Sequence, residues 1–184
     1  AGAYELLINP WARSSGLASS NTASIRGIES VFLNVAGLTG TNSTEVMFSH
    51  ASWFADISIS SFVVGQKVGD TGVMGISFMS LDFGEIVRTT EQNPNGGLGT
   101  FSPQFMNVGL SYAKKFTNRI SGGVTLRLIS ESAAEIAANG FSFDTGIHYE
   151  TGDRNQAKFG IALKNIGTGM AFNGDGDDVT LMGE

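Results

Sequence analysis

The sequence has 184 residues, a net charge of −6, 25 glycines and no cysteine. This length suits one domain, and the lack of cysteine excludes disulfide scaffolds, thiolate metal sites and cysteine nucleophiles. An acidic balance without a cluster of lysine and arginine argues against nucleic-acid binding, and without a run of about 18 apolar residues no transmembrane helix is expected. A soluble β protein and a membrane β-barrel remain.

Residues 1–43 show no clean alternation of apolar and polar side chains. A small, polar stretch at 11–20 precedes a compact apolar patch at 31–38. Two interpretations are open: a hatch or plug packed inside a barrel, or an ordered periplasmic lead-in. As a hatch, the segment would cover an apolar pocket lined by Leu6, Leu7, Ile8, Val31, Phe32 and Leu33.

From residue 44 onward, apolar and polar side chains alternate with the period of two that is typical of β-strands. Seven strands are predicted, near 44–50, 54–66, 72–82, 103–116, 119–130, 140–150 and 156–166. The sequence therefore predicts an all-β, antiparallel architecture over residues 44–184, preceded by the hatch segment 1–43.

The two faces of these strands differ in character. One carries bulky apolar side chains, and the other carries mostly glycine, serine, alanine and asparagine. A soluble sandwich turns its bulky face inward and its charged face outward, but the second face here is too small and too sparsely charged to face water. It fits a crowded, partly polar lumen with the bulky face toward lipid, and strands of about 10–12 residues match a tilted membrane crossing. We therefore predict a transmembrane β-barrel, with a soluble, ligand-binding β-barrel as the alternative.

The connections between the predicted strands alternate in length. Short turns at 67–70, 117–118 and 151–154 alternate with longer segments at 83–102 and 131–139. Membrane barrels have tight periplasmic turns and longer outer loops. Aromatic side chains would form girdles at the two ends: Trp53, Phe54, Phe83, Phe101 and Phe105 toward the long loops, and Phe116 and Tyr149 toward the turns.

The strand count points to a larger protein. Single-chain bacterial barrels have an even number of strands, whereas this sequence offers seven and the start of an eighth at 179–182. It lacks a terminal aromatic strand that would close a barrel. We expect the sequence to cover about the N-terminal half of a larger barrel.

Short motifs along nearly the whole chain resemble one family. They are LLINPWARSSG at 6–16, FLNVAGL at 32–38, FSH and WFAD at 48–50 and 53–56, LDFGEI at 81–86, GLSYA at 109–113 and LKNIG at 163–167. Together these resemble the PorV/PorQ family of FadL-like outer-membrane barrels, which are linked to type IX secretion in Bacteroidetes.

This resemblance implies a barrel of about fourteen strands in the bacterial outer membrane, in contact with outer-membrane lipids. It implies a non-enzymatic role in protein transport, in which outer loops bind the type IX translocon or secreted cargo; such systems also serve gliding motility. The alternative is a FadL-like transporter of hydrophobic small molecules. A plugged, polar interior favours the first role and a continuous apolar tunnel favours the second. For partner binding we single out the loop 83–102, with Phe83, Glu85, Arg88 and Phe101.

No motif indicates catalysis, a cofactor or a metal. His50 and His148 lie far apart without a carboxylate at ligand spacing, and no Gly-x-Ser-x-Gly motif occurs. The acidic residues Asp175, Asp177 and Asp178 lack the spacing and the closing glutamate of an EF-hand. We interpret them as part of a solvated outer loop rather than as a calcium site.

One pair of charged residues is predicted to meet inside the barrel. If the loop centred near Glu135 joins two symmetric strands, Arg127 lies opposite Asp144 and both point into the lumen. Directly opposed residues interact, and a desolvated pair is hydrogen-bonded. We predict a structural salt bridge here, and one helical turn in the loop at 132–140.

Overall fold

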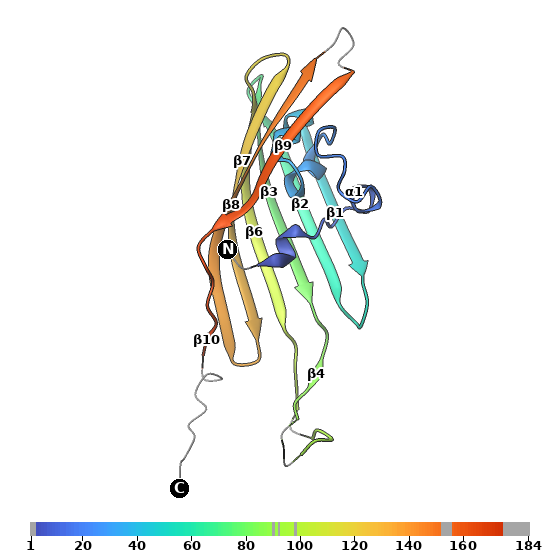
Figure 1. The fold of residues 1–184 in the computed structure, drawn as a ribbon, viewed down its shortest axis with the longest axis vertical. Helices are drawn as coiled ribbons and strands as arrows, with labels where there is room; N and C mark the ends of the chain where they lie inside the picture. Colours follow the sequence, from blue (N-terminus) through green and yellow to red (C-terminus); the bar gives the residue numbers. More distant parts are fainter. Residues whose placement is uncertain (1–2, 90, 92, 98, 152–155, 175–184) are drawn as a thin grey trace.

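The computed structural model describes residues 3–89, 91, 93–97, 99–151 and 156–174, and over these the chain is all-β. An eight-stranded antiparallel sheet runs in the order β1-β2-β3-β6-β7-β8, and β8 then pairs with both β9 and β10 (Figure 1). Its strands are β1 (Thr44–Ser52), β2 (Ser58–Val68), β3 (Gly72–Asp82), β6 (Gln104–Lys115), β7 (Ile120–Ala133), β8 (Ile136–Thr151), β9 (Ala157–Gly167) and β10 (Asn173–Gly174). A separate hairpin joins β4 (Ile86–Val87) to β5 (Thr100–Phe101). The predicted antiparallel all-β architecture is confirmed. Over the described residues the sheet is open, with β1 and β9 at its edges.

The connection between β7 and β8 differs from the prediction. Only Ala134 and Glu135 separate the two strands, so the predicted loop at 131–139 and its helical turn are wrong. Ala134 takes a left-handed φ of 52°, which closes the hairpin, and Ser132 pairs with Ala137. Cross-strand pairing here overrides the helix propensity of an alanine-rich run. The predicted alternation of short turns and long loops does not hold at this hairpin, because its connection is also short.

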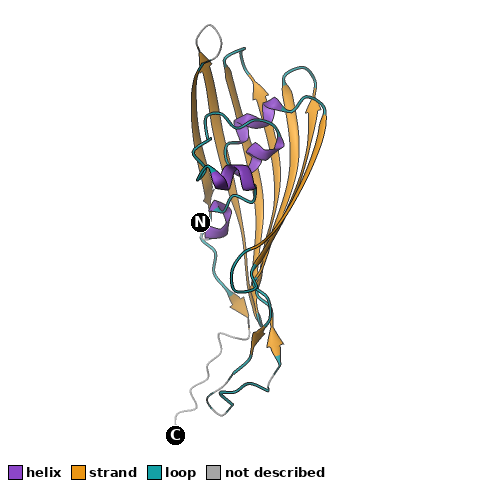
Figure 2. Ribbon diagram, turned by 90° about the vertical axis from the view of Figure 1, so that its right-hand side faces the viewer, coloured by secondary structure: helices purple, strands orange, loops and turns teal. Residues whose placement is uncertain are grey.

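The sheet has an inner face, covered by the N-terminal segment (residues 3–43), and an opposite outer face. Figure 2 shows the short helices lying on the inner face. Small polar side chains of the strands are buried beneath them: Ser61, Ser77, Asn107, Ser111, Thr125 and Ser142. The outer face carries large exposed apolar side chains: Phe48, Ile76, Leu110, Leu126, Leu128, Phe141 and Ile161. The polarity of this sheet is thus the inverse of that of a water-soluble sandwich.

The N-terminal segment consists of short helical turns packed on the sheet: η1 (Tyr4–Leu7), α1 (Ala12–Gly16), η2 (Ile28–Phe32) and η3 (Val35–Gly40). Trp11, Ile28 and Phe32 form one apolar cluster with strand residues such as Val63 and Met79. Within the described part of the chain, no helix has the length and hydrophobicity needed to cross a membrane.

Two residues of the predicted aromatic girdle lie inside instead. The rings of Phe83 and Phe105 meet edge to face at 4.8 Å between centroids, and both pack against the apolar cluster. Trp53 and Phe54 are exposed in the tight turn before β2, and Phe116 is exposed at the opposite end of the sheet. We call the end of the sheet that holds the β2–β3 and β6–β7 turns the turn end, and the opposite end of the sheet the loop end.

Candidate functional site

The inner face is organised around Arg127 of β7, which is only 2% exposed. Its Nε donates to Oδ2 of Asp144 on β8 at 3.0 Å, so the structure brings the predicted pair together. The predicted register is wrong by two residues: Arg127 faces Ser142, and Asp144 faces Thr125. The two-residue turn at Ala134 and Glu135 shifts the centre of the hairpin, and the pair meets along a diagonal that a long arginine spans.

The remaining donors of Arg127 join the strands to the N-terminal segment. Nη2 donates to the carbonyl oxygen of Val31 at 2.9 Å. Nη1 donates to Oδ1 of Asn107 at 3.4 Å and to Oγ of Ser77 at 3.5 Å. The guanidinium carbon lies 5.1 Å from the centroid of the Phe32 ring. One buried guanidinium therefore holds four strands (β3, β6, β7 and β8) and η2 together.

A β-bulge in β9 provides the second set of contacts. The pairing of β8 with β9 shifts between Phe143 and Thr145, and Oδ1 of Asp144 accepts a hydrogen bond from the backbone N–H of Asn165 at 2.7 Å. Nζ of Lys164 donates to the carbonyl oxygens of Leu6 at 3.0 Å and of Phe32 at 2.8 Å. Bulges redirect side chains, and this one places a lysine against the N-terminal segment. Sequence reasoning missed Lys164 because its partners are backbone atoms far away in the chain.

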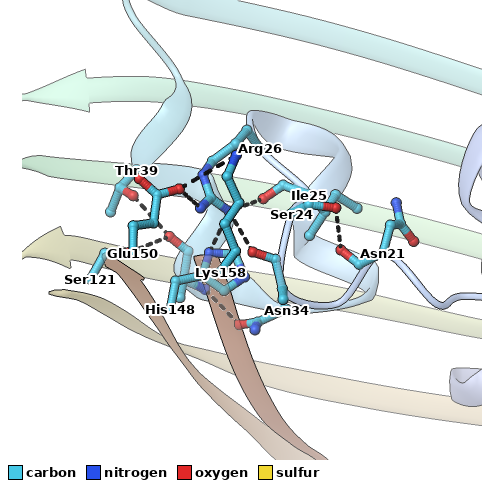
Figure 3. Close-up of polar contacts among 12 residues, drawn as sticks. Asn21, Ser24, Ile25, Arg26, Asn34, Thr39, Ser121, His148, Glu150 and Lys158 are labelled. Carbon is cyan, nitrogen blue, oxygen red and sulfur yellow. Dashed lines mark hydrogen bonds and ion pairs between the residues drawn. The ribbon is translucent and has the colours of Figure 1, made fainter. Parts of the chain in front are cut away.

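A second polar cluster lies near the turn end and links Arg26 to β8 and β9 (Figure 3). Nη1 of Arg26 lies 2.7 Å from Nδ1 of His148, and Nη2 forms an ion pair with Glu150. Nζ of Lys158 lies 3.8 Å from the same carboxylate. Nε2 of His148 lies 2.7 Å from the carbonyl oxygen of Thr22. A carbonyl only accepts, so Nε2 carries the proton and Nδ1 accepts from Arg26.

Asn34 closes the space beside this cluster. Its Nδ2 donates to the carbonyl oxygens of Thr22 at 3.1 Å and of Ile147 at 3.3 Å. Gly146 faces it, and a Cβ added there would come within 2.0 Å of Oδ1 of Asn34. Next to the cluster, a polar hollow of about 210 Å³ is lined by residues that include Arg26, Lys115, Arg119, Ser121 and Glu150.

The loop predicted to bind partners has a defined shape. Arg88 lies 5.8 Å from the centroid of the Phe101 ring and forms a 3.0 Å ion pair with Glu135 of the β7–β8 hairpin. Glu85 is exposed, whereas Phe83 packs inward. Glu85, Arg88 and Phe101 therefore lie on the accessible part of this loop, and Phe83 serves the core.

The predicted apolar pocket is formed by largely different residues. A hollow of about 370 Å³ lies between η1 and strands β3, β6 and β7. Of the six residues predicted to line the pocket, only Ile8 lines this hollow. The others are either buried elsewhere in the protein (Leu6, Val31, Phe32 and Leu33) or exposed (Leu7). The hollow is lined by Ala3, Tyr4, Glu5, Ile8, Leu81, Phe83, Phe105 and Glu131.

Glu5 is the acidic residue that the N-terminal segment contributes to the lining of this hollow. Burial raises the pKa of Glu5 to about 7, and the nearby Glu131 carboxylate raises it too, while a backbone hydrogen bond opposes this increase. Glu5 therefore binds a proton more readily than an exposed glutamate does.

The other candidate sites of the sequence stay apart. Nδ1 of His50 contacts Oγ of Ser60 at 2.9 Å on the exposed face of β1. Within the described ranges no three histidine or acidic side chains come together as metal ligands. Asp175, Asp177 and Asp178, and the predicted eighth strand at 179–182, lie outside the described residues. A scan against protein-family models and a search of curated proteins give no match to this chain.

Proposed function

We propose that this protein is a non-enzymatic outer-membrane β-barrel of the type IX secretion system, similar to PorV/PorQ proteins. In this proposal the chain forms about half of a barrel of roughly fourteen strands, and its N-terminal segment is a hatch inside the lumen. The loop-end surface binds the translocon or secreted cargo.

One observation carries the proposal: the sheet exposes its apolar face and buries its polar face. Leu128 and Ile161 are 70% and 71% exposed, while Ser77 and Ser111 are fully buried. Exposed apolar patches of this extent are rare on soluble monomers, whereas membrane barrels have an apolar outer band and a polar interior. The open edges at β1 and β9 leave backbone groups for further strands to pair with.

The polar interior supports a scaffold over a transporter. A transporter of hydrophobic molecules needs an apolar route, but the buried pair of Arg127 and Asp144 lies on the inner face. Arg127 and the half-buried Lys164 also bind the hatch. The hollow beside η1 favours a FadL-like transporter, because its wall is mainly apolar. We therefore keep transport as the second candidate function.

The test is a gentle detergent isolation of the tagged protein from outer membranes, followed by mass spectrometry of the proteins bound to it. We expect translocon subunits or cargo to be bound. Glu85→Lys reverses an exposed charge in the loop and is expected to reduce their recovery. Asp70→Lys makes the same change in the exposed β2–β3 turn and serves as the matched control.

Three results would count against the proposal in different ways. Recovery without detergent would refute the membrane barrel. Recovery with a bound fatty acid and no protein partner would favour transport. Equal recovery of partners with Glu85→Lys and Asp70→Lys would move the binding surface away from the loop.

A further inference from the structure

Lys114 of β6 occupies an unusual position on the outer face. It is exposed near the turn end, and its neighbours in the register are Gly72 on β3 and Gly122 on β7. The ring of Tyr112 lies over Gly72, where an added Cβ would come within 3.0 Å of the tyrosine hydroxyl oxygen. The next outward residue on β6 is Tyr112, which faces Val124.

A hollow of about 300 Å³ begins at this lysine. Its walls are mainly apolar and include Tyr112, Phe116, Val124 and Ile147, and Gly122 lies among them. A Cβ added to Gly122 would come within 2.9 Å of Cε2 of Phe116. The missing side chain therefore shapes the hollow.

The charge at this position stands out from its surroundings. In the register of the described strands, Lys114 is the one lysine or arginine that faces outward. The inward-facing set contains Lys67, Lys115, Arg127 and Lys158, and Lys164 in the β9 bulge contacts the N-terminal segment. The outward acidic residue, Asp82, lies at the other end of β3. Lys114 therefore gives the groove a positively charged end, and the rest of its wall is mainly apolar.

We propose that this groove binds an anionic glycerophospholipid, with an acyl chain along Tyr112, Val124 and Ile147 and the phosphate at the Lys114 ammonium group. The inference rests on the proposed membrane placement, which puts the turn end at the headgroup level. Basic residues at that level attract anionic headgroups, and an apolar groove beside one selects a lipid over a free phosphate ion. Lysines on apolar surfaces commonly extend their ammonium group toward water. In this proposal Lys114 instead binds the headgroup of a particular class of lipid.

The experiment is native mass spectrometry of the full chain from detergent micelles that contain phosphatidylglycerol or phosphatidylcholine. The wild-type protein is expected to retain phosphatidylglycerol in preference. Lys114→Gln is expected to weaken this retention about fivefold, the effect of one basic residue near an anionic headgroup. Gly122→Leu fills the groove and is expected to reduce retention of both lipids.

Two controls separate recognition from general charge. Lys67→Gln removes the same charge at the same end of the sheet, but from a residue in the inward-facing set, and Lys114→Arg keeps the charge in the groove. Both are expected to retain phosphatidylglycerol like the wild type. If Lys114→Gln also retains it fully, or if the wild type shows no preference, the lipid site is refuted while the barrel stands. A chain that stays soluble without detergent refutes the barrel and the lipid site together.

Discussion

Replacing Arg127 by methionine tests how the inner face is held together. The substitution keeps most of the side-chain volume but leaves Asp144 buried with the backbone N–H of Asn165 as its remaining donor. It also removes the donor to the carbonyl oxygen of Val31. Because both charges are buried, with side-chain exposures of 2% and 6%, breaking the pair is expected to cost about 3–5 kcal/mol of unfolding free energy.

The double variant Arg127→Met/Asp144→Asn makes the prediction specific. Its asparagine oxygen still accepts from Asn165, and no buried carboxylate is left without a countercharge. We expect it to lose less stability than Arg127→Met alone, with a coupling energy of about 2 kcal/mol, within the range of contacting pairs. The unpaired carbonyl of Val31 accounts for a remaining cost of about 1–3 kcal/mol.

Equilibrium urea unfolding of the protein refolded into lipid vesicles measures these differences. The sequence has two tryptophans, and Trp11 lies 5.9 Å from Phe32, the ring beneath Arg127. In a Trp53→Phe background, Trp11 fluorescence reports on the N-terminal segment. Unchanged stability of Arg127→Met, or simple additivity of the two substitutions, would refute this account of the inner face.

Three further predictions concern the attachment of the N-terminal segment. Lys164→Met removes two hydrogen bonds to backbone carbonyls, so trypsin is expected to cleave after the exposed Arg13 several times faster while the strands stay folded. Since burial raises the pKa of Glu5 from 4.5 to about 7, its protonated form stabilises the docked η1. This stabilisation is complete below pH 4.5 and is lost as the pH rises through 7; amide hydrogen exchange of η1 should follow that curve, and Glu5→Gln should abolish it. Gly146→Ala is expected to destabilise the protein by about 1–3 kcal/mol, the usual cost of overpacking, because the added methyl collides with Asn34; a loss below 0.5 kcal/mol in urea unfolding would contradict the close approach.

The strands could be predicted from sequence because their signal is local. A period of two assigns alternate residues to opposite faces, and the outer face of β6 with Val108, Leu110 and Tyr112 follows directly from it. The β7–β8 hairpin is not predictable in this way, because small residues such as Ala133 and Ala137 carry no strong alternation. The positions of Phe83 and Phe105 are not predictable either, because an aromatic side chain near a strand end can point to either face and the tertiary structure decides which.

The polar contacts of the inner face were only partly accessible from sequence. Arg127 and Asp144 lie on neighbouring strands, so a hairpin argument brings them together. Arg26 and His148 are separated by 122 residues, and Lys164 and Phe32 by 132. No spacing rule connects such residues, because their positions depend on the path of the N-terminal segment across the sheet.

These long-range contacts bear directly on the choice between scaffold and transporter. The strands satisfy their own backbone groups through the sheet ladders, so the N-terminal segment can detach without breaking a strand. It is held by hydrogen bonds from charged groups, chiefly Arg127 to Val31 and Lys164 to Leu6 and Phe32, each worth about 1.5–3 kcal/mol. A molecule crossing the lumen would have to displace these contacts and leave Asp144 buried without its partner, whereas binding at the loop end leaves them intact. Variants at Lys164 that free the N-terminal segment should therefore increase the passage of small hydrophobic molecules in a transporter and leave partner recovery unchanged in a scaffold.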